Sequence, residues 1–480
     1  MPFLLHSGNT PSLRWVYFLS PFFLFLVGSY LFWPTTTLSS PVHDTAKPNY
    51  SQPSNNNSQP SSSPEVEIKK PPLQGVIPPS SGEILPTPPE EIRCPWIPGI
   101  EDIHVVVKTG ASEALEKLHI HANTTLHCVP HYTIFSDYEE DVSGFHVYDV
   151  LKGVADEVKN SHPDFQIYNR LRESGRVALA EYDINDDPST PSGKPQNPGW
   201  VLDKWKFLPM MHETLTMRPN AKWYVFMEVD TYFMWPNLLS WLEQFNYRKS
   251  YYLGNQMKIG DTVFGHGGSG VILSQAALQR VVAFHSTRVK EWDDFTARHW
   301  AGDCVLGKAL QDAGVGLTWS WPMLHGFTPN TFDHLSPAYA GKLPWCYPPV
   351  AYHHMTPEDI RRTWDFEQYW AKDRADLLIL HSDVFRELVQ RRLSKAERDW
   401  DNQSGDLIEG VASVSDCATL CARNAECRQY SFETGNHCRT SNVVRRGESR
   451  SGIVSGWMSE RINQTVTELG LCEEYTWIRP

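Results

Sequence analysis

The sequence predicts an α/β protein with a mostly parallel sheet that is covered by helices on both faces. Short β-branched or apolar runs alternate with segments of helical composition, and turns rich in Gly, Asp or Ser end these runs. The chain has 480 residues, which is too long for one ordinary domain. Its first 92 or so residues are predicted to be non-globular, which leaves room for one large domain and one small one.

The N-terminal segment predicts a membrane anchor. Residues 1–14 form a short tail, and residues 15–33 are almost wholly apolar and uncharged, which is long enough to span a bilayer. Arg14 precedes this span and no Lys or Arg follows until Lys47, so we expect the N-terminus in the cytoplasm. A cleaved signal peptide is the alternative, but the apolar run is long and no small-residue cleavage site follows it.

Residues 34–92 predict a disordered stem. The segment is rich in Ser, Pro, Asn and Thr, so it cannot bury enough apolar surface to offset its ordering entropy. Such a composition is typical of an O-glycosylated stalk. The N-glycosylation sequons all follow the predicted span and would face the lumen. They lie at Asn49, Asn56, Asn123, Asn402 and Asn463.

Charge and cysteine content narrow the class of protein. The net charge is −13 and there is no long basic run, so nucleic acid is not an expected partner. A nucleotide diphosphate is still compatible, because a bound cation can dominate the local field. All nine cysteines follow the predicted span, where an oxidising compartment favours disulfides. Because nine is odd, at least one thiol is free or pairs between chains.

The globular part begins with alternating elements. Residues 104–110 are a β-branched run stopped by glycine, predicted as the first strand, and residues 112–121 have the composition of a helix. A second strand is predicted at residues 131–135. Residues 148–176 are polar and periodic, which predicts a helix. Residues 182–200 are rich in Asp, Asn, Pro, Ser and Gly, which predicts a loop.

The most informative segment is an apolar strand that ends in two acids. A helix predicted at residues 204–215 leads to a strand at residues 223–227, which is followed by Glu228, Val229 and Asp230. Two such carboxylates can converge on one hard cation. Open α/β sheets bind ligands at the carboxyl ends of their strands, so a cation held there can hold a diphosphate. A solvated polar turn is the alternative.

Three further segments complete the pattern. The glycine-rich run at residues 265–270 lets backbone approach a ligand closely, and it precedes a helix predicted at residues 275–284. Another helix is predicted to start near Gly302, and residues 350–355 predict a turn.

Together these segments resemble glycosyltransferase family 31, the group that contains the Fringe proteins and the core 1 β1,3-galactosyltransferases. The resemblance covers about residues 94–366 and implies a GT-A fold over residues 93–375, a UDP-sugar donor, Mn²⁺ and inversion at the anomeric carbon. The residues that carry it are Lys108-Thr109-Gly110, Trp205-Lys206, Trp223 to Tyr232, Gly267-Gly268-Ser269-Gly270, Leu273-Ser274, Asp303, Leu306-Gly307 and Tyr352-His353.

The resemblance also assigns residues to the donor and the metal. The donor nucleotide is expected to contact Thr109, Gly110, Lys206, Glu228, Val229 and Asp230, and the loop between donor and acceptor is expected to contain Gly267 and Gly268. Mn²⁺ accepts carboxylate and imidazole ligands. Its expected ligands are Glu228, Asp230 and His353, with His354 as the alternative imidazole. The family usually begins its triplet with Asp and has an acid in the middle, where this chain has Glu228 and Val229.

An inverting transfer needs a general base on the acceptor hydroxyl, opposite the leaving group. The resemblance implies that Asp303 fills this role, and a helix N-cap is the alternative role for it. The family usually has an acid just before this position, where this chain has Gly302. Asp293 and Asp294 are the other candidates.

A small second module is predicted at residues 409–460, after a helical linker at residues 376–408 and before a tail at residues 461–480. Its cysteines follow the pattern C-x3-C-x5-C-x10-C, which resembles a PAN/Apple module. The resemblance implies the pairs Cys417–Cys438 and Cys421–Cys427, and a unit of this size needs such staples. A zinc site is the alternative, although no suitably spaced pair of histidines accompanies the cysteines.

The predicted function is that of a Golgi (or endoplasmic reticulum) type II membrane enzyme. It would transfer a sugar, galactose by first preference, from a UDP-sugar to a glycan or glycoprotein hydroxyl and form a β1,3 bond. Transfer of N-acetylglucosamine, as in Fringe, is one alternative. A non-catalytic lectin or scaffold with an inactive transferase fold is the other. The PAN-like module would add a protein or carbohydrate ligand.

Overall fold

A computed structural model describes residues 94, 97–184, 193–374, 378–433, 435 and 437–479. The chain divides into two units, Met1–Pro86 and Thr87–Pro480, and every described residue belongs to the second unit. The predicted tail, anchor and stem lie outside the described residues, as do Asn49 and Asn56. Within the described part, no helix is long and apolar enough to cross a membrane.

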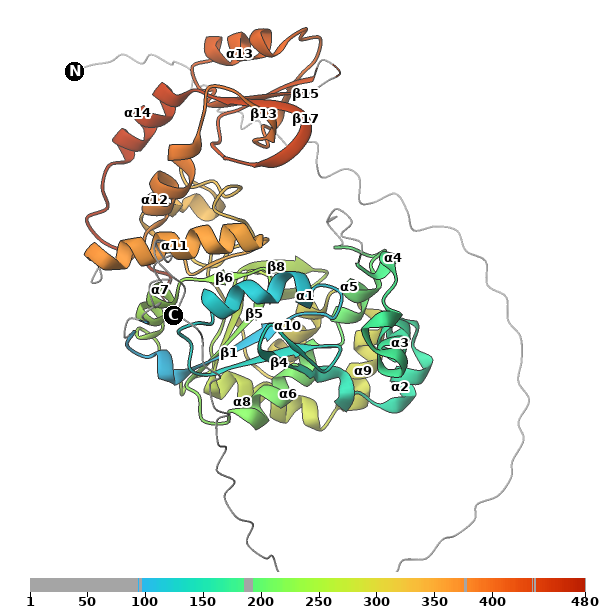
Figure 1. Cartoon of the computed structure of the whole chain (residues 1–480). Coiled ribbons are helices and arrows are strands. Elements are labelled where there is room, and N and C mark those ends of the chain that lie inside the picture. The colour runs from blue at the N-terminus through green and yellow to red at the C-terminus, as the bar shows by residue number, and fades with distance from the viewer. Residues whose placement is uncertain are drawn as a thin grey trace, which may run out of the picture. The chain divides into compact units, whose positions relative to one another are not determined.

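An eight-stranded mixed sheet forms the centre of the larger α/β part of the described chain, residues 97–374 (Figure 1). Its strands are β1 (Ile103–Lys108), β2 (Tyr132–Ser136), β3 (Glu140–Val142), β4 (Phe145–Asp149), β5 (Trp223–Glu228), β7 (Tyr252–Gly254), β10 (Val271–Ser274) and β11 (Leu317–Trp319). Their order is β11-β7-β10-β5-β1-β2-β4-β3. The pairs β5-β1, β1-β2, β2-β4 and β11-β7 are parallel, while β10 and β3 run antiparallel to their neighbours. The sheet is therefore mostly parallel, as predicted.

Helices bury both faces of this sheet. Along β1, Val106 belongs to one apolar cluster, while Val105 and Val107 belong to a second cluster on the other face. The first cluster includes residues of α3 (Gln166–Ser174), α6 (Phe207–Met217), α8 (Gln275–Ser286), α9 (Val289–Arg298) and α10 (Gly302–Asp312). The second includes residues of α7 (Trp235–Leu242) and of the 3-10 segment Leu118–Asn123. This three-layer arrangement fits a GT-A-like fold.

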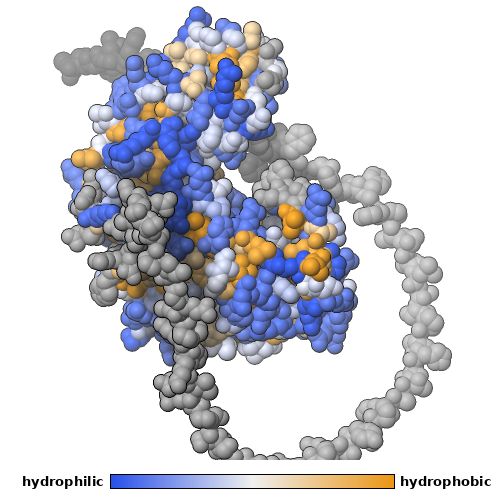
Figure 2. All heavy atoms as spheres, viewed as in Figure 1, coloured by the Kyte–Doolittle hydropathy of each residue, from blue (hydrophilic) through white to orange (hydrophobic). Residues whose placement is uncertain are grey.

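The remaining helices and strands of the α/β part are short or lie at the edges of this part. They are α1 (Ala114–Lys117), α2 (Asp156–Ser161), α4 (Glu181–Ile184), α5 (Pro198–Asp203), β6 (Tyr232–Phe233), β8 (Gln256–Ile259), β9 (Thr262–Gly265), β12 (Ala351–Tyr352) and α11 (Pro357–Arg374). Figure 2 shows a group of apolar residues on the surface around α4 and α5, where Val177, Tyr182 and Ile184 are exposed.

Two predicted segments differ in the structure. The segment 148–176, predicted as one helix, begins with the last residues of β4 and continues as several short helices. A break lies before Pro163, because proline has no backbone N–H and forces His162 into extended backbone (ψ 131°). The loop predicted at residues 182–200 overlaps most of α4 and the start of α5. The Asn197 side chain caps α5 by accepting a hydrogen bond from Trp200 N, and proline takes the first helical position.

The C-terminal part forms a five-stranded antiparallel sheet with one helix on it. Its strands are β13 (Glu397–Asp401), β14 (Asp406–Ile408), β15 (Gln429–Glu433), β16 (His437–Ser441) and β17 (Glu448–Trp457), in the order β13-β17-β15-β16-β14. The disulfides Cys417–Cys438 and Cys421–Cys427 are the pairs that the PAN/Apple resemblance implies. The first ties α13 (Val414–Arg423) to β16, and the second ties it to the connection before β15. Because β13 pairs with β17, the sheet begins inside the segment predicted as a helical linker.

Only the first part of that segment is helical, over α12 (His381–Val384), the π-helix Phe385–Val389 and the 3-10 segment Gln390–Arg392. The predicted tail is also structured. It contains most of α14 (Ser459–Leu469), and Cys472 forms a disulfide with Cys346. A fourth disulfide joins Cys94 to Cys128, and the buried Cys304 is the free thiol.

One predicted glycosylation site, Asn402, has a buried side chain. The Asn402 side chain is fully buried, and its Nδ2 donates to Tyr430 O at 3.0 Å and to Gly456 O at 3.4 Å. A glycan on this nitrogen would break these bonds, so Asn402 has a structural role in the folded chain. Asn123 and Asn463 are exposed and compatible with glycans.

Candidate active site

The carboxyl ends of β1 and β5 bring the first site residues together. In the parallel register of these strands, Lys108 lies beside Glu228, and Asp230 follows in the turn after β5. The turn leads into β6, and β6 pairs with β12. His353 is the residue that follows β12. The pairing of β6 with β12 therefore brings a residue more than 120 positions away in the sequence to the acidic end of β5.

Asp230, His353 and His354 form a group that can hold a divalent cation, because their ligand atoms lie within 4.8 Å of one another. His353 Nε2 lies 3.2 Å from Asp230 Oδ1 and 3.7 Å from Glu228 Oε2. His354 has a left-handed backbone (φ 59°), and its ring centroid is 3.9 Å from that of His353. A donor set of carboxylate and imidazole suits Mn²⁺. Glu228 lies at the edge of this group.

Gly268 makes the position of His353 possible. A Cβ at Gly268 would lie 2.1 Å from Cε1 of the His353 ring, so only glycine fits. The carbonyl of Gly268 also accepts a hydrogen bond from Thr231 Oγ1 at 2.9 Å. The glycine predicted for the donor and acceptor loop therefore acts by admitting the imidazole.

Buried cations keep both acids ionised. Burial would raise the pKa of Glu228, but Lys108, whose Nζ lies 3.2 Å from Glu228 Oε1, and His353 hold that pKa well below its usual range. Burial would likewise raise the pKa of Asp230, but His353 and Lys117, at 3.6 Å, hold it below its usual range. Both carboxylates are therefore charged and able to bind a cation.

His353 forms ion pairs with both acids. Burial would lower the pKa of the imidazole, but the charges of Asp230 and Glu228 outweigh burial and raise the pKa to about 9. The side chain is thus held in place by the same oxygens that would share a metal with it. Its Nδ1 is buried and has no hydrogen-bond partner among the described residues.

Lys206 has a different place from the one predicted. Its side chain is buried, and its Nζ donates to Thr109 O at 2.8 Å and pairs with Asp137 at 3.1 Å. It also lies 3.4 Å from Asp203, which forms a second ion pair with Lys108. Lys206 therefore fixes the turn after β1 and presents no free charge to a donor.

The turn after β1 surrounds this ammonium group. A Cβ on Gly110 would lie 3.3 Å from Lys206 Nζ, and the Thr109 hydroxyl is 3.5 Å from Glu113 Oε1. Thr109 and Gly110, two of the residues predicted to contact the donor, thus lie directly after the carboxyl end of β1, beside the acidic triplet.

Val229 explains one departure from the family pattern. Its side chain is buried in the apolar cluster on the second face of the sheet, and its carbonyl accepts a hydrogen bond from His121 Nε2 at 2.7 Å. An acid at this position would lose its hydration without gaining an ionic partner there. The middle residue of the triplet is therefore a packing residue in this chain.

Asp303 lies across the glycine turn from the metal group. It is the second residue of α10, and its carboxylate accepts hydrogen bonds from Gly267 N at 3.0 Å and Cys304 N at 2.8 Å. A Cβ on Gly267 would lie 3.2 Å from Glu228 Oε1 and 3.4 Å from Asp303 Cβ, so this turn separates the two acids. Ala301 occupies the N-cap position of α10 and makes no side-chain cap hydrogen bond, so Asp303 lies inside the helix and is not its N-cap.

The pKa of Asp303 suits a general base. Burial raises the pKa to about 6, although the Gly267 N–H opposes this shift by stabilising the carboxylate. The carboxylate is therefore ionised at neutral pH and more basic than an exposed aspartate. Asp293 and Asp294 lie on α9 and form no hydrogen bond or ion pair with Asp303 or Glu228 in the described part of the chain.

Gly302 explains the second departure. A Cβ at this position would lie 2.4 Å from the Phe207 ring and 2.6 Å from Lys204 Cα. The junction of α5 and α6 occupies the space that an acidic side chain needs in the family pattern. The absence of the acid thus follows from close packing beside Asp303.

An aromatic stack that the sequence analysis missed lies directly before Asp303. The rings of Trp200 and Trp300 are stacked with centroids 6.2 Å apart, and His299 continues the stack at 6.4 Å. Trp300 is 43% exposed. In the sequence, the position of Trp300 three residues before the predicted base could have indicated this stack.

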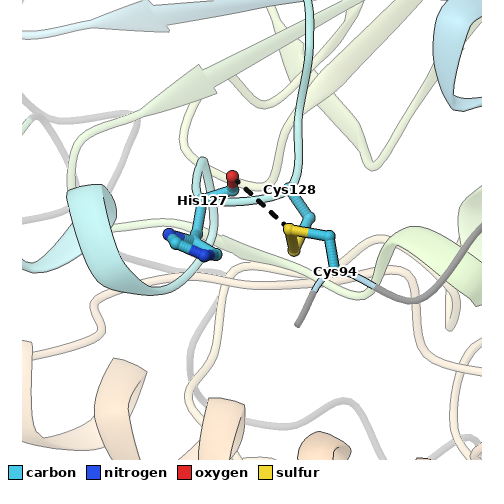
Figure 3. A group of neighbouring side chains, drawn as sticks. All are labelled: Cys94, His127 and Cys128. Carbon is cyan, nitrogen blue, oxygen red and sulfur yellow. Dashed lines mark hydrogen bonds between the residues drawn. A yellow bond between two sulfur atoms is a disulfide. The ribbon is translucent and has the colours of Figure 1, made fainter. Parts of the chain in front are cut away.

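A second cluster of metal-type residues is excluded as a metal site. Cys94, His127 and Cys128 lie together, but Figure 3 shows the two sulfurs joined in a disulfide. The sulfurs carry neither the charge nor the lone-pair strength of thiolates, so they are no metal ligands. The line drawn from Cys94 to His127 O, 3.7 Å, marks a close contact.

The fold and the site together define a glycosyltransferase-type domain. A family model described as Fringe-like matches residues 99–356, which is more than half of the chain and includes every residue of the site described above. The chain therefore belongs to the Fringe-like family, and membership implies glycosyltransferase activity. No curated protein matches the chain.

The close approach of Gly268 to His353 generates a test of the metal group. We expect Gly268→Ala to displace the imidazole and to weaken Mn²⁺ binding by roughly 10–100-fold, as loss of supporting contacts around ligands does. Gly316→Ala is the matched control, because a Cβ there meets nothing within 4 Å. Titration of Mn²⁺ by electron paramagnetic resonance measures both variants. Equal affinities would remove His353 from the ligand set.

Proposed function

We propose that the chain is an inverting, Mn²⁺-dependent glycosyltransferase that uses a UDP-sugar donor and a glycan or glycoprotein acceptor. The observation that carries this proposal is the placement of Asp303 on one side of the Gly267 turn and of Glu228, Asp230 and His353 on the other. Inverting transfer needs this separation, since the base and the leaving group act on opposite sides of the anomeric carbon.

The metal group is proposed to hold the donor diphosphate. Asp230 and the neutral imidazole of His353 would bind Mn²⁺, with the imidazolium proton released as the cation takes over its charge, and Glu228 would contact the metal or the ribose. When bound, the cation neutralises charge on the departing diphosphate. Lys108 and Lys117 keep the two acids ionised, and Gly268 admits the imidazole.

Asp303 is proposed to take the proton from the acceptor hydroxyl as that oxygen attacks the anomeric carbon. The hydrogen bond from Gly267 N fixes the orientation of the carboxylate, and burial supplies its basicity. The departures at Val229 and Gly302 leave this arrangement intact, because both residues are explained by packing. That favours an active enzyme over an inactive scaffold.

The finer specificity is proposed from the resemblance. We favour a β1,3 bond and galactose as the sugar, with N-acetylglucosamine as the alternative. We also propose a single-pass type II protein of the Golgi membrane with a luminal catalytic domain. Four disulfides among the described residues support an oxidising compartment.

Donor hydrolysis tests the activity. We expect the purified chain to release UDP from one member of a panel of UDP-sugars, and to do so only with Mn²⁺. Asp230→Ala should abolish this release and the Mn²⁺-dependent binding of UDP, because the clamp loses a charged ligand. Asp312→Ala is the control, since that acid pairs with Lys308 on the exposed side of α10. Calorimetry of UDP with and without Mn²⁺ provides the measurement, and unchanged binding in Asp230→Ala would contradict the ligand assignment.

The role of Asp303 has its own test. Asp303→Asn removes the basic carboxylate, so we expect kcat to fall by about 10²–10⁴-fold while Mn²⁺–UDP binding is kept. One of the two backbone N–H groups would face an amide N–H, which costs about 1 kcal/mol of folding stability. Asp293→Asn should keep its turnover. If the reverse pattern is measured, the base lies on α9.

The same carboxylate predicts the pH profile. Because burial raises the pKa of Asp303 to about 6, the wild-type kcat/KM should be full at neutral pH and fall as the pH drops through about 6. Initial rates between pH 5 and 8 at saturating Mn²⁺ measure the profile. A profile that stays flat down to pH 5 would contradict a base with this pKa.

The Trp200–Trp300 stack is proposed to contact the acceptor. An exposed indole beside the base offers a flat apolar surface to a sugar ring. We expect Trp300→Ala to raise the acceptor KM about tenfold with little change in donor hydrolysis, and Trp300→Phe to retain most of the affinity. Tyr369→Ala, on an exposed face of α11, is the control. A changed donor KM would place Trp300 on the donor side.

A further inference from the structure

The C-terminal sheet has a polar pocket on the face opposite its helix. Tyr430 and Cys438 pack with α13 on one face. On the other face, the strand register sets Ser431 opposite Arg439, and Glu433 opposite both His437 and Ile453. These five residues line a cavity of about 310 Å³ together with Asp401, Gln403, Ser404 and Arg450. The volume is at the lower end of the roughly 300–1,000 Å³ that small-ligand sites span.

The chain segment that forms the rim is held rigidly. Buried Asn402 donates to Tyr430 O and Gly456 O, and its own carbonyl accepts from Gln429 Nε2 at 2.7 Å. Gln403 has a left-handed backbone (φ 57°), and such strain persists where the surroundings hold it. The rim is therefore ordered before any ligand arrives, which lowers the entropic cost of binding.

Three polar side chains of the pocket have no partner. Within the described part of the chain, the side chains of Arg439, Glu433 and His437 make no hydrogen bond or ion pair, although Arg439 and Glu433 are half-buried. By contrast, Arg450 is paired with Asp401 at 3.1 Å. Partly desolvated charged groups gain from a ligand that supplies their missing hydrogen bonds.

We propose that this pocket binds a neutral monosaccharide unit of a glycan. Vicinal hydroxyls both donate and accept hydrogen bonds, so they can satisfy the Glu433 carboxylate and the Arg439 guanidinium together. The two arginines and two acids of the pocket balance in formal charge, which gives no preference for a strongly charged ligand. The site belongs to the C-terminal module and does not depend on the proposed transferase chemistry.

The size and composition of the pocket favour a sugar over a peptide. An extended peptide binds by adding main-chain hydrogen bonds along a strand edge, whereas this cavity lies on the face of the sheet, between residues of three adjacent strands. Ile453 is its apolar contributor, so an apolar ligand has little surface to cover.

Glycan binding by the full chain in detergent, without UDP and with a chelator, tests the proposal. The probes are immobilised oligosaccharides with terminal galactose, glucose, mannose or N-acetylglucosamine, alongside sialylated glycans and an acidic peptide. We expect binding of at least one neutral probe. Arg439→Ala and Glu433→Gln should each weaken it by roughly tenfold or more, because the alanine removes the guanidinium donors and the glutamine replaces a charged acceptor oxygen by an N–H donor.

The matched control is Arg398→Ala. Arg398 is an exposed arginine of β13 whose register partner Val454 lies opposite Phe432, on the helix-covered face. It should bind the neutral probe as the wild type does, and all three variants should keep wild-type donor hydrolysis. If Arg439→Ala fails to fold, as judged by its melting curve, the nearly isosteric Glu433→Gln decides the test.

Three outcomes would overturn the proposal. The first is a wild-type chain that binds no neutral glycan, and the second is unchanged affinity in Arg439→Ala and Glu433→Gln. The third is binding confined to the sialylated glycans or to the acidic peptide, which would assign the pocket to an anionic ligand. Inhibition of the neutral-probe binding by the free monosaccharide would separate a terminal sugar from a longer polysaccharide epitope.

Discussion

The active site depends on the compensation of buried negative charge at the ends of β1 and β5. Burial alone would raise the pKa of both Glu228 and Asp230, and neutral carboxyls would be poor cation ligands. Lys108, Lys117 and His353 prevent this, because each lies within 4 Å of one of these acids. Burial would lower the pKa of both lysines, but Asp203 together with Glu228 raises the pKa of Lys108, and Glu113 together with Asp230 raises that of Lys117. The sheet register, which places Lys108 beside Glu228, is therefore a catalytic constraint as well as a structural one.

The local pattern in the sequence was enough to predict the class of fold and the elements that carry the candidate site, while the roles of the site residues came from the family resemblance. The strand before Glu228, the glycine turn and the helix at Gly302 are signals within a few residues, and the structure has all three elements at or near the predicted positions. The pair of Lys108 with Asp203 could not be predicted, because 95 residues separate its members and only the tertiary fold brings them together. The resemblance assigns Lys206 to the donor, but its partners are Thr109 O after β1 and Asp137 after β2. These contacts also depend on the tertiary fold and are not visible in the local sequence.

Sequence motifs carry no information on burial, which can override local chemistry. The sequon at Asn402 has the right spacing for glycosylation, yet its buried side chain donates hydrogen bonds to the backbone of β15 and β17. The triplet at Glu228 departs from the family pattern at Val229, and the reason is visible only in the apolar cluster that surrounds this side chain. A motif specifies which groups are available, and packing decides which of them are free to react or to be modified.

Glycines connect packing to chemistry in this active site. Gly268 admits the His353 ring, Gly267 separates the acids on its two sides, and Gly302 lets the start of α10 approach the α5–α6 junction. A side chain at any of these positions would move a charged group rather than simply fill space. Since the metal group and the proposed base meet across a single turn of backbone, small displacements there would change both donor binding and proton transfer. The lack of side-chain volume at these positions is thus part of how the Fringe-like domain of this chain positions its acids.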